Sequence, residues 1–80
     1  MNNKVYLSDL KVGEKGVIKK LNFSDKKIRR HLLDLGVTVG AKVEIKRRAP
    51  MNDPVDIIVR GYELAIRKKD LQNIEVEVTV

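Results

Sequence analysis

The sequence predicts a mostly β protein: a small, strongly bent barrel of five short strands, with one short α-helix between the early strands. Apolar and polar residues alternate with a period of two through most of the second half of the chain, which is typical of half-buried strands. Tight turns rich in glycine and proline separate these segments. A barrel is expected because closure removes the exposed edges that a flat sheet would leave. Eighty residues form one domain, which we expect to span residues 1–80.

The strand pattern is clearest where branched apolar residues alternate with charged ones. Val43 and Ile45 show it, and so do the later apolar residues of the chain. A hairpin turn is expected at residues 60–63, where Gly61 can adopt a positive φ. Leu7 and Leu10 are expected to face the core from a turn-rich lead-in. The five expected strands lie at residues 17–21, 42–46, 55–60, 64–66 and 74–80.

The helix is expected to begin near Ser24, whose hydroxyl can accept a hydrogen bond from a free backbone N–H of the first turn. Ile28, Leu32 and Leu35 follow at helical spacing and form one apolar stripe. Gly36 is expected to end the helix, because a glycine adopts the left-handed conformation without a Cβ clash. A turn with one helical coil is expected at residues 68–73.

Positive charge is concentrated around this helix. Residues 15–30 hold seven basic residues and one acid, a difference of six, which equals the net charge of the whole chain. Such a patch indicates an acidic partner surface, although a solvated face that only aids solubility is the competing interpretation. Two pairs, Asp25 with Arg29 and Arg30 with Asp34, are spaced to form ion pairs along the helix. The candidate docking residues here are Lys26, Lys27, Arg29 and Arg30.

The loop at residues 49–54 is the second candidate for docking. Its two prolines restrict φ and so lower the entropy that is lost on folding or binding. A methionine between them offers an adaptable apolar tip, or else packs inward as part of a stiff hairpin connection. The candidate docking residues of this region are Arg47, Arg48, Pro50, Met51 and Asp53.

Metal binding and catalysis have little support in the sequence. There is no cysteine, and His31 has only Asp34 near it in sequence, which leaves a transition metal short of ligands. Asp53 and Asp56 flank Pro54 without a nucleophile–base pair, and no glycine-rich phosphate loop is present. We therefore expect no enzyme activity, no metal site, no cofactor and no tight small-molecule ligand.

Nucleic acid binding is not expected either. Barrels that bind single strands usually present stacking aromatic side chains beside a positive groove. This chain has only Tyr6, Phe23 and Tyr62, and Phe23 is expected to cap the core beside the helix. No signal peptide or apolar run of membrane-spanning length is visible, so a cytoplasmic location is expected.

Taken together, these motifs resemble the FeoA family, small cytoplasmic proteins of bacterial ferrous iron uptake with an SH3-like barrel. The resemblance covers nearly the whole chain, with two departures: His31 stands where the family usually has arginine, and Val39 where it usually has proline. The matching residues are 7–10, Gly13, Gly16, 30–36, Gly40, Val43, 48–54, 60–67 and 74–76.

The resemblance implies a partner, the FeoB membrane GTPase transporter, on whose cytoplasmic part the protein would dock to modulate Fe(II) transport. Arg30, Arg47 or Arg48 could act in trans on GTP hydrolysis, and the sequence does not choose among them. The alternative is a stand-alone metal-responsive or nucleic-acid-binding SH3-like module, related to the C-terminal domain of iron-dependent repressors. Weak homo-oligomers through an exposed strand edge are left open.

Overall fold

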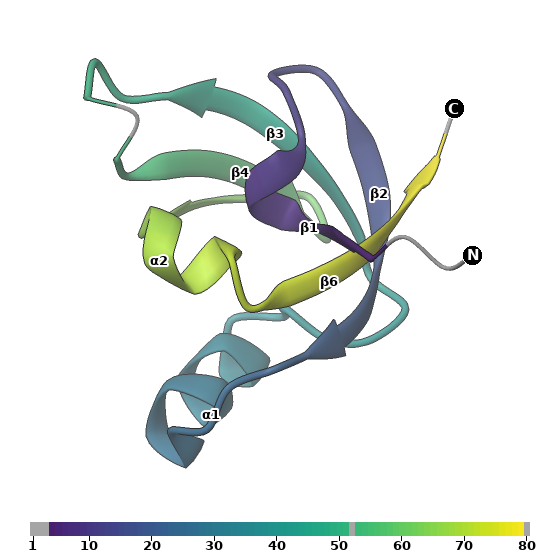
Figure 1. Cartoon of the computed structure of the whole chain (residues 1–80), viewed down its shortest axis with the longest axis vertical. Coiled ribbons are helices and arrows are strands. Elements are labelled where there is room, and N and C mark those ends of the chain that lie inside the picture. The colour runs from purple at the N-terminus through teal and green to yellow at the C-terminus, as the bar shows by residue number, and fades with distance from the viewer. Residues whose placement is uncertain (1–3, 52, 80) are drawn as a thin grey trace.

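The computed structural model describes residues 4–51 and 53–79 (Figure 1). These residues form six strands, two α-helices and one short 3-10 helix, so the fold is mostly β with one longer helix between the early strands, as the sequence predicts. The elements in chain order are β1 (Val5–Tyr6), η1 (Leu7–Asp9), β2 (Lys15–Leu21), α1 (Lys26–Asp34), β3 (Lys42–Arg48), β4 (Val55–Val59), β5 (Tyr62–Ile66), α2 (Lys68–Leu71) and β6 (Ile74–Thr79).

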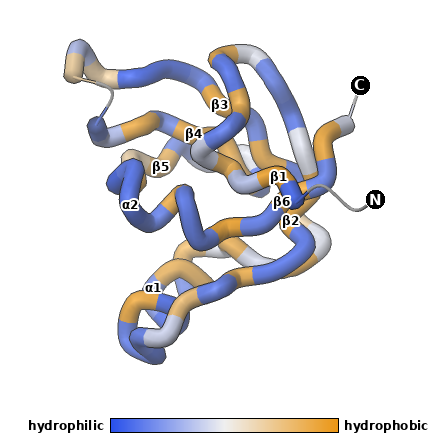
Figure 2. Tube along the Cα trace, in the orientation of Figure 1, coloured by the Kyte–Doolittle hydropathy of each residue, from blue (hydrophilic) through white to orange (hydrophobic). Residues whose placement is uncertain are grey.

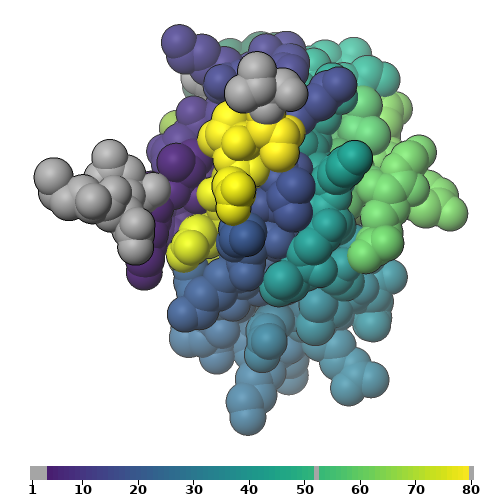
Figure 3. All heavy atoms as spheres, turned by 90° about the vertical axis from the view of Figure 1, so that its right-hand side faces the viewer, coloured from purple at the N-terminus to yellow at the C-terminus, as the bar shows by residue number. Residues whose placement is uncertain are grey.

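The strands form one antiparallel sheet in the order β1-β6-β2-β3-β4-β5. Figure 3 shows β6 in yellow, β2 in blue and β3 in teal next to one another on one face of the molecule. The expected number of five strands is wrong by one. The additional strand, β1, has only two residues, Val5 and Tyr6, too few to show an alternating pattern in the sequence.

The sheet is strongly bent. The register shifts in β2 between Ile18 and Lys20, and in β3 between Ile45 and Arg47, and such irregularities increase strand bending and twist. Within the described residues the hydrogen-bonded order ends at β1 on one side and at β5 on the other. The bent sheet is therefore barrel-like, but the complete closure expected from the sequence is not observed.

Sixteen apolar side chains form one core inside this bend. Leu7 and Leu10, expected to face the core, are 0% and 2% exposed. Figure 2 shows the alternation of hydrophobic and hydrophilic residues along the strands, which places one face of each strand inward. Phe23 packs against the edge of the core, as expected.

A two-residue turn, Arg60-Gly61, joins β4 to β5, so the turn is shorter than the four residues expected. Both residues have positive φ, 52° and 83°, as a type I′ hairpin turn requires. Tyr62 and Glu63, expected in the turn, belong to β5 and pair with Val59 and Ile58. The expected helical coil after β5 is α2.

Candidate docking surface

Helix α1 begins one residue later than expected, and its N-cap is Asp25 rather than Ser24. The Asp25 carboxylate accepts a hydrogen bond of 2.8 Å from the backbone N–H of Lys27. Serine and aspartate are both good N-caps, so two adjacent candidates left the exact start undetermined from sequence.

The C-terminus of α1 is fixed by Gly36, as predicted. Gly36 has a φ of 94°, its N–H donates to the Leu33 carbonyl (3.0 Å), and the Val37 N–H donates to the Leu32 carbonyl (2.9 Å). These two bonds make a Schellman motif, which satisfies carbonyls that the helix itself leaves free. The chain therefore leaves α1 in a defined direction.

Arg60 in the β4–β5 turn also positions α1, a contact that sequence analysis does not predict. The Arg60 guanidinium donates to the Gly36 carbonyl (3.1 Å) and to Thr38 Oγ1 (2.6 Å). A cation at this position also interacts favourably with the negative end of the helix dipole. Arg60 and Gly36 are 24 residues apart, so only the tertiary structure shows the contact.

The apolar stripe of α1 is narrower than expected. Leu32 is 4% exposed and Ile28 packs against the core, but Leu35 is 37% exposed. Leu35 is the C-cap residue, where the chain turns away from the helical path. Leu33 is 38% exposed on the outer side. The helix thus contacts the barrel along a thin line and presents most of its surface to solvent.

The four candidate cations of α1 are all exposed. The i, i+4 ion pairs expected on this helix are not formed, and among the described residues none of these cations takes part in an ion pair. Three of them flank a shallow groove together with Leu33 and Asp34. We name the set Lys26, Lys27, Arg29 and Arg30 the basic face of α1.

Two of these charges work against the helix. Lys26 and Lys27 occupy the first turn, which contains no acidic residue. The N-terminal end of a helix carries a partial positive charge, so cations there are unfavourable by a few tenths of a kcal/mol or more. Residues that destabilise their own helix are expected at functional sites, so Lys26 and Lys27 are candidates for a role in binding.

The two basic candidates after the bulge in β3, Arg47 and Arg48, form contacts with other residues of the chain. Arg47 pairs with Asp56 across the sheet at 3.1 Å. Arg48 is half-buried, and its guanidinium donates to the carbonyls of Leu10 (2.6 Å) and Ser8 (3.4 Å). Arg48 therefore ties the end of β3 to the N-terminal segment and offers little to a partner.

Asp53 also has a partner within the chain. Its carboxylate accepts a 3.0 Å hydrogen bond from the backbone N–H of Lys68, the first residue of α2. At the loop tip Met51 is 85% exposed, so the inward-packing alternative for this residue is wrong. Of the candidates in this region, Pro50 and Met51 are exposed, and Arg47 and Asp53 are exposed but already hold contacts within the chain.

The basic face of α1 and the loop around Met51 lie far apart. In Figure 1, α1 is at the bottom and the β3–β4 loop at the top, along the longest axis of the molecule. The figure turned by 90° about the same vertical axis again places α1 at the foot (Figure 3). The basic face of α1 and the loop tip are therefore two separate surfaces.

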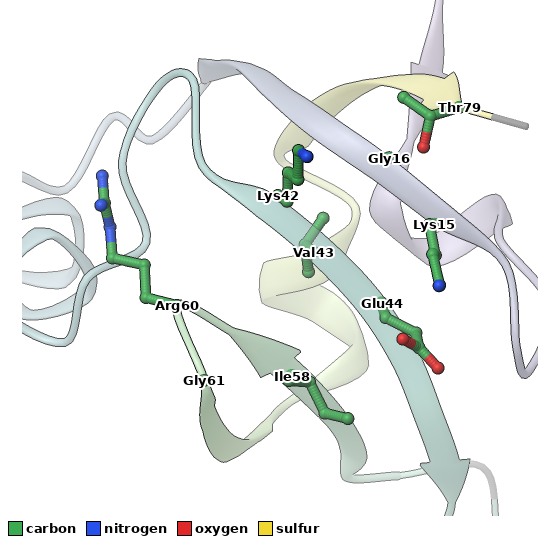
Figure 4. A pocket seen from close by; sticks show the side chains of 9 residues that line it. All are labelled: Lys15, Gly16, Lys42, Val43, Glu44, Ile58, Arg60, Gly61 and Thr79. Carbon is green, nitrogen blue, oxygen red and sulfur yellow. The ribbon is translucent and has the colours of Figure 1, made fainter.

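A second groove crosses the outer face of β2, β3 and β4. Figure 4 shows Lys42 and Glu44 of β3 projecting outward, whereas Val43 points to the interior and Arg60 turns away from the sheet. Lys15 and Glu44 are opposite each other in the β2–β3 register. Charges of both signs thus line this groove, unlike the basic face of α1.

His31 lies on the exposed surface of α1. Across residues 4–51 and 53–79, no three His, Cys, Asp or Glu side chains come together as a group that could hold a metal ion. In the same part of the chain, no helix is both long and apolar enough to cross a membrane.

Comparison with known proteins gives a family match. The FeoA domain model matches residues 5–78. A protein of Porphyromonas gingivalis named "Fe(2+) transport protein A/Fe(2+) transporter FeoB fusion protein" is 31% identical over 71 residues, covering 89% of this chain. This chain spans only 8% of the length of that relative.

Solved structures agree with this match. The solution structure of a FeoA protein from Chlorobium tepidum superposes with a TM-score of 0.89 at 32% identity, covering 95% of this chain and 71% of that chain. A manganese-dependent transcriptional repressor superposes with a TM-score of 0.88 at 14% identity, covering 99% of this chain and 38% of that chain. At that identity the second likeness shows the fold alone.

Proposed function

The chain belongs to the FeoA domain family, and we propose that it is a small cytoplasmic accessory protein of bacterial ferrous iron uptake. In this proposal it docks on the cytoplasmic part of a FeoB-type membrane GTPase transporter and modulates transport. The family match over residues 5–78 carries the proposal. A relative whose name joins transport protein A and FeoB in one polypeptide supports it, because fusion keeps two interacting modules at high effective concentration.

We assign the docking contact to the basic face of α1. Its four cations are exposed and, among the described residues, free of ion pairs, so they can meet carboxylates of a partner without first breaking internal contacts. Leu33 adds an exposed apolar side chain beside them. Positive charge of this kind raises the rate of encounter with an acidic surface and makes it sensitive to salt.

The loop tip has a different place in this proposal. Pro50 and Met51 are exposed at the other end of the molecule, so a flat partner surface that covers α1 does not also cover them. We therefore treat the loop tip as a candidate for a separate contact. Of the three arginines considered for action in trans on GTP hydrolysis, Arg48 is half-buried with partners in the fold, Arg47 is exposed in an ion pair with Asp56, and Arg30 is exposed on α1 without one.

A calorimetric titration tests the docking proposal. The cytoplasmic part of the FeoB-type transporter from the same organism is titrated with the intact chain at low and at moderate salt. We expect saturable binding that weakens as salt rises, since the contact is largely electrostatic. No detectable binding at high micromolar concentration would contradict the proposal.

The alternative function, a metal-responsive or nucleic-acid-binding module, has one observation in its favour: the likeness in fold to the manganese-dependent repressor. Titration with generic duplex DNA distinguishes the two functions. Binding to DNA that is tight at low salt and falls steeply with added salt would favour the alternative. Binding to the transporter with no binding to DNA would favour docking.

A further inference from the structure

The two edges of the sheet differ in how they are protected against pairing with another strand. Natural proteins protect edges by keeping them very short, by placing lysine or proline on them, or by a bulge. Edge strand β1 has only two residues. Edge strand β5, Tyr62–Ile66, has five residues, contains no lysine or proline, and pairs with β4 without a register shift. Charged side chains in general also protect an edge, and Glu63 is the one charged residue of β5; the edge is otherwise without these protections.

The hairpin turn determines which backbone groups of β5 face outward. In a two-residue hairpin the flanking residues, Val59 and Tyr62, form a hydrogen-bonded pair, and such pairs alternate along an antiparallel ladder. The N–H and C=O groups of Glu63 and Ala65 therefore point away from β4. Among the described residues, no turn, loop or side-chain hydrogen bond reaches these four groups. Both residues are also exposed.

We propose that β5 pairs with β5 of a second copy of this chain, antiparallel and about a two-fold axis at Leu64. In this register Glu63 lies opposite the partner's Ala65, and Ala65 opposite the partner's Glu63. Each of these is a hydrogen-bonded pair, so all four outward groups of each copy find partners. A two-fold interface needs a surface that is complementary to itself. The outward N–H and C=O groups of β5 are complementary to the same groups of a second copy in this register.

Charge repulsion disfavours the alternative register centred on Glu63. In that register the Glu63 carboxylates of the two copies would lie opposite each other. A register centred on Ala65 would instead bring Glu63 opposite the partner's Arg67. The Arg67 carbonyl, however, already accepts hydrogen bonds from the N–H groups of Asp70 and Leu71 at the start of α2. The register centred on Leu64 uses only groups that are free, and it adds an apolar Leu64–Leu64 contact at the axis.

The interface is small, so the dimer is expected to be weak, with dissociation at high micromolar to millimolar concentration. It involves no residue of the basic face of α1. The proposal therefore does not rest on the proposed function, and either can fail without the other.

Sedimentation equilibrium and amide hydrogen exchange of the intact protein test the pairing. We expect the average mass to rise towards that of a dimer at millimolar concentration, and exchange of the Glu63 and Ala65 amides to slow in parallel. Ala65→Pro removes an outward donor without removing a bond to β4, and proline is tolerated on sheet edges. This variant should stay monomeric, and Ala65→Ser, which keeps the N–H, should dimerise like the wild type.

A cysteine substitution tests the register, because the chain contains no cysteine of its own. Leu64 residues at the axis form a non-hydrogen-bonded pair, whose side chains are close enough for a disulfide. Leu64→Cys should therefore cross-link into dimers several-fold faster than Ala65→Cys. Faster cross-linking of Ala65→Cys would overturn the register. A wild type that is monomeric at millimolar concentration, or an Ala65→Pro variant that dimerises equally well, would overturn the proposal.

Discussion

The barrel and helix α1 differ in how their charged residues are arranged. On the barrel, Lys19 pairs with Glu77, Lys46 with Glu63 and Arg47 with Asp56, while Lys15, Lys20 and Lys42 form no ion pair among the described residues. On α1, the four cations of the basic face form no ion pair among the described residues, and two of them oppose the helix dipole. The contrast is one of grouping: the four unpaired cations of α1 lie together on one helix and are available to a partner, whereas part of the barrel's charge is held in ion pairs between strands.

This difference implies that stability and partner binding can be separated by mutation. Substitutions in the barrel core should destabilise the protein, and substitutions on the basic face should change binding with little change in folding. A domain of this size has only about 5–15 kcal/mol of net stability, so the two kinds of effect differ clearly in size.

The largest effect is expected in the core of the barrel. Ile57 is 0% exposed in the middle of β4, and Ile57→Ala should lower the free energy of unfolding by about 2–5 kcal/mol, because it removes buried methylenes and leaves a cavity. Urea denaturation followed by circular dichroism measures it. Ile58→Ala, on the half-buried outer face of the same strand, is the control and should cost clearly less. Equal losses would mean that the core is not where the structure places it.

A smaller effect is expected at Arg48, whose hydrogen bonds connect the end of β3 to the N-terminal segment. Arg48→Met keeps the apolar stem but removes the donor to the Leu10 carbonyl, and should lower the free energy of unfolding by about 1–3 kcal/mol. Arg47→Met breaks only an exposed ion pair and should cost about 0–1 kcal/mol. Chemical denaturation of both variants compares them, and a larger loss for Arg47→Met would contradict the assigned roles.

The N-cap of α1 gives the next smaller effect. Asp25→Ala should lower the free energy of unfolding by about 1 kcal/mol, since the N–H of Lys27 loses its acceptor. Ser24→Ala should change it by less than about 0.5 kcal/mol. Thermal denaturation at matched pH measures both. If Ser24→Ala were the more costly substitution, Ser24 and not Asp25 would be the cap.

The smallest effect on stability should have the opposite sign. Lys26→Glu places a negative charge at the positive end of the helix dipole and should raise the free energy of unfolding by about 0.3–1 kcal/mol. The gain should shrink in 1 M salt because added ions screen it. If Lys26→Glu also weakens partner binding, it would show that residues of α1 serve binding at a cost in stability, unlike residues of the barrel core. If Lys26→Glu instead lowered the free energy of unfolding at low salt, the helix dipole would not be what makes a positive charge at position 26 unfavourable.

Much of the fold follows from local pattern. The alternation at Val43 and Ile45 and the glycines at positions 36 and 61 place strands, helix end and hairpin, because each of these depends on neighbouring residues alone. The features of the fold that could not be predicted depend on contacts between distant residues or on very short segments. The two-residue β1 shows no period, and the open edge of β5 depends on which strands become neighbours.

The candidate site divides in the same way. The basic face of α1 could be predicted from sequence, because helical spacing alone brings its cations to the exposed side. The roles of Arg48 and Arg60 could not, because their hydrogen-bond partners lie 38 and 24 residues away. The sequence also does not show how the helix and the Met51 loop lie relative to each other, and the path of β3 carries them to opposite ends of the molecule.

The most direct test of the account is the affinity of two charge-matched variants for the cytoplasmic part of the FeoB-type transporter. One variant reverses the basic face of α1 to glutamate (Lys26, Lys27, Arg29 and Arg30), and the other reverses four exposed lysines elsewhere (Lys11, Lys15, Lys42 and Lys69). Both have the same net charge. We expect the α1 variant to lose at least tenfold more affinity than the control, a difference of about 1.4 kcal/mol. Equal losses would show that only net charge matters, and would contradict docking through α1.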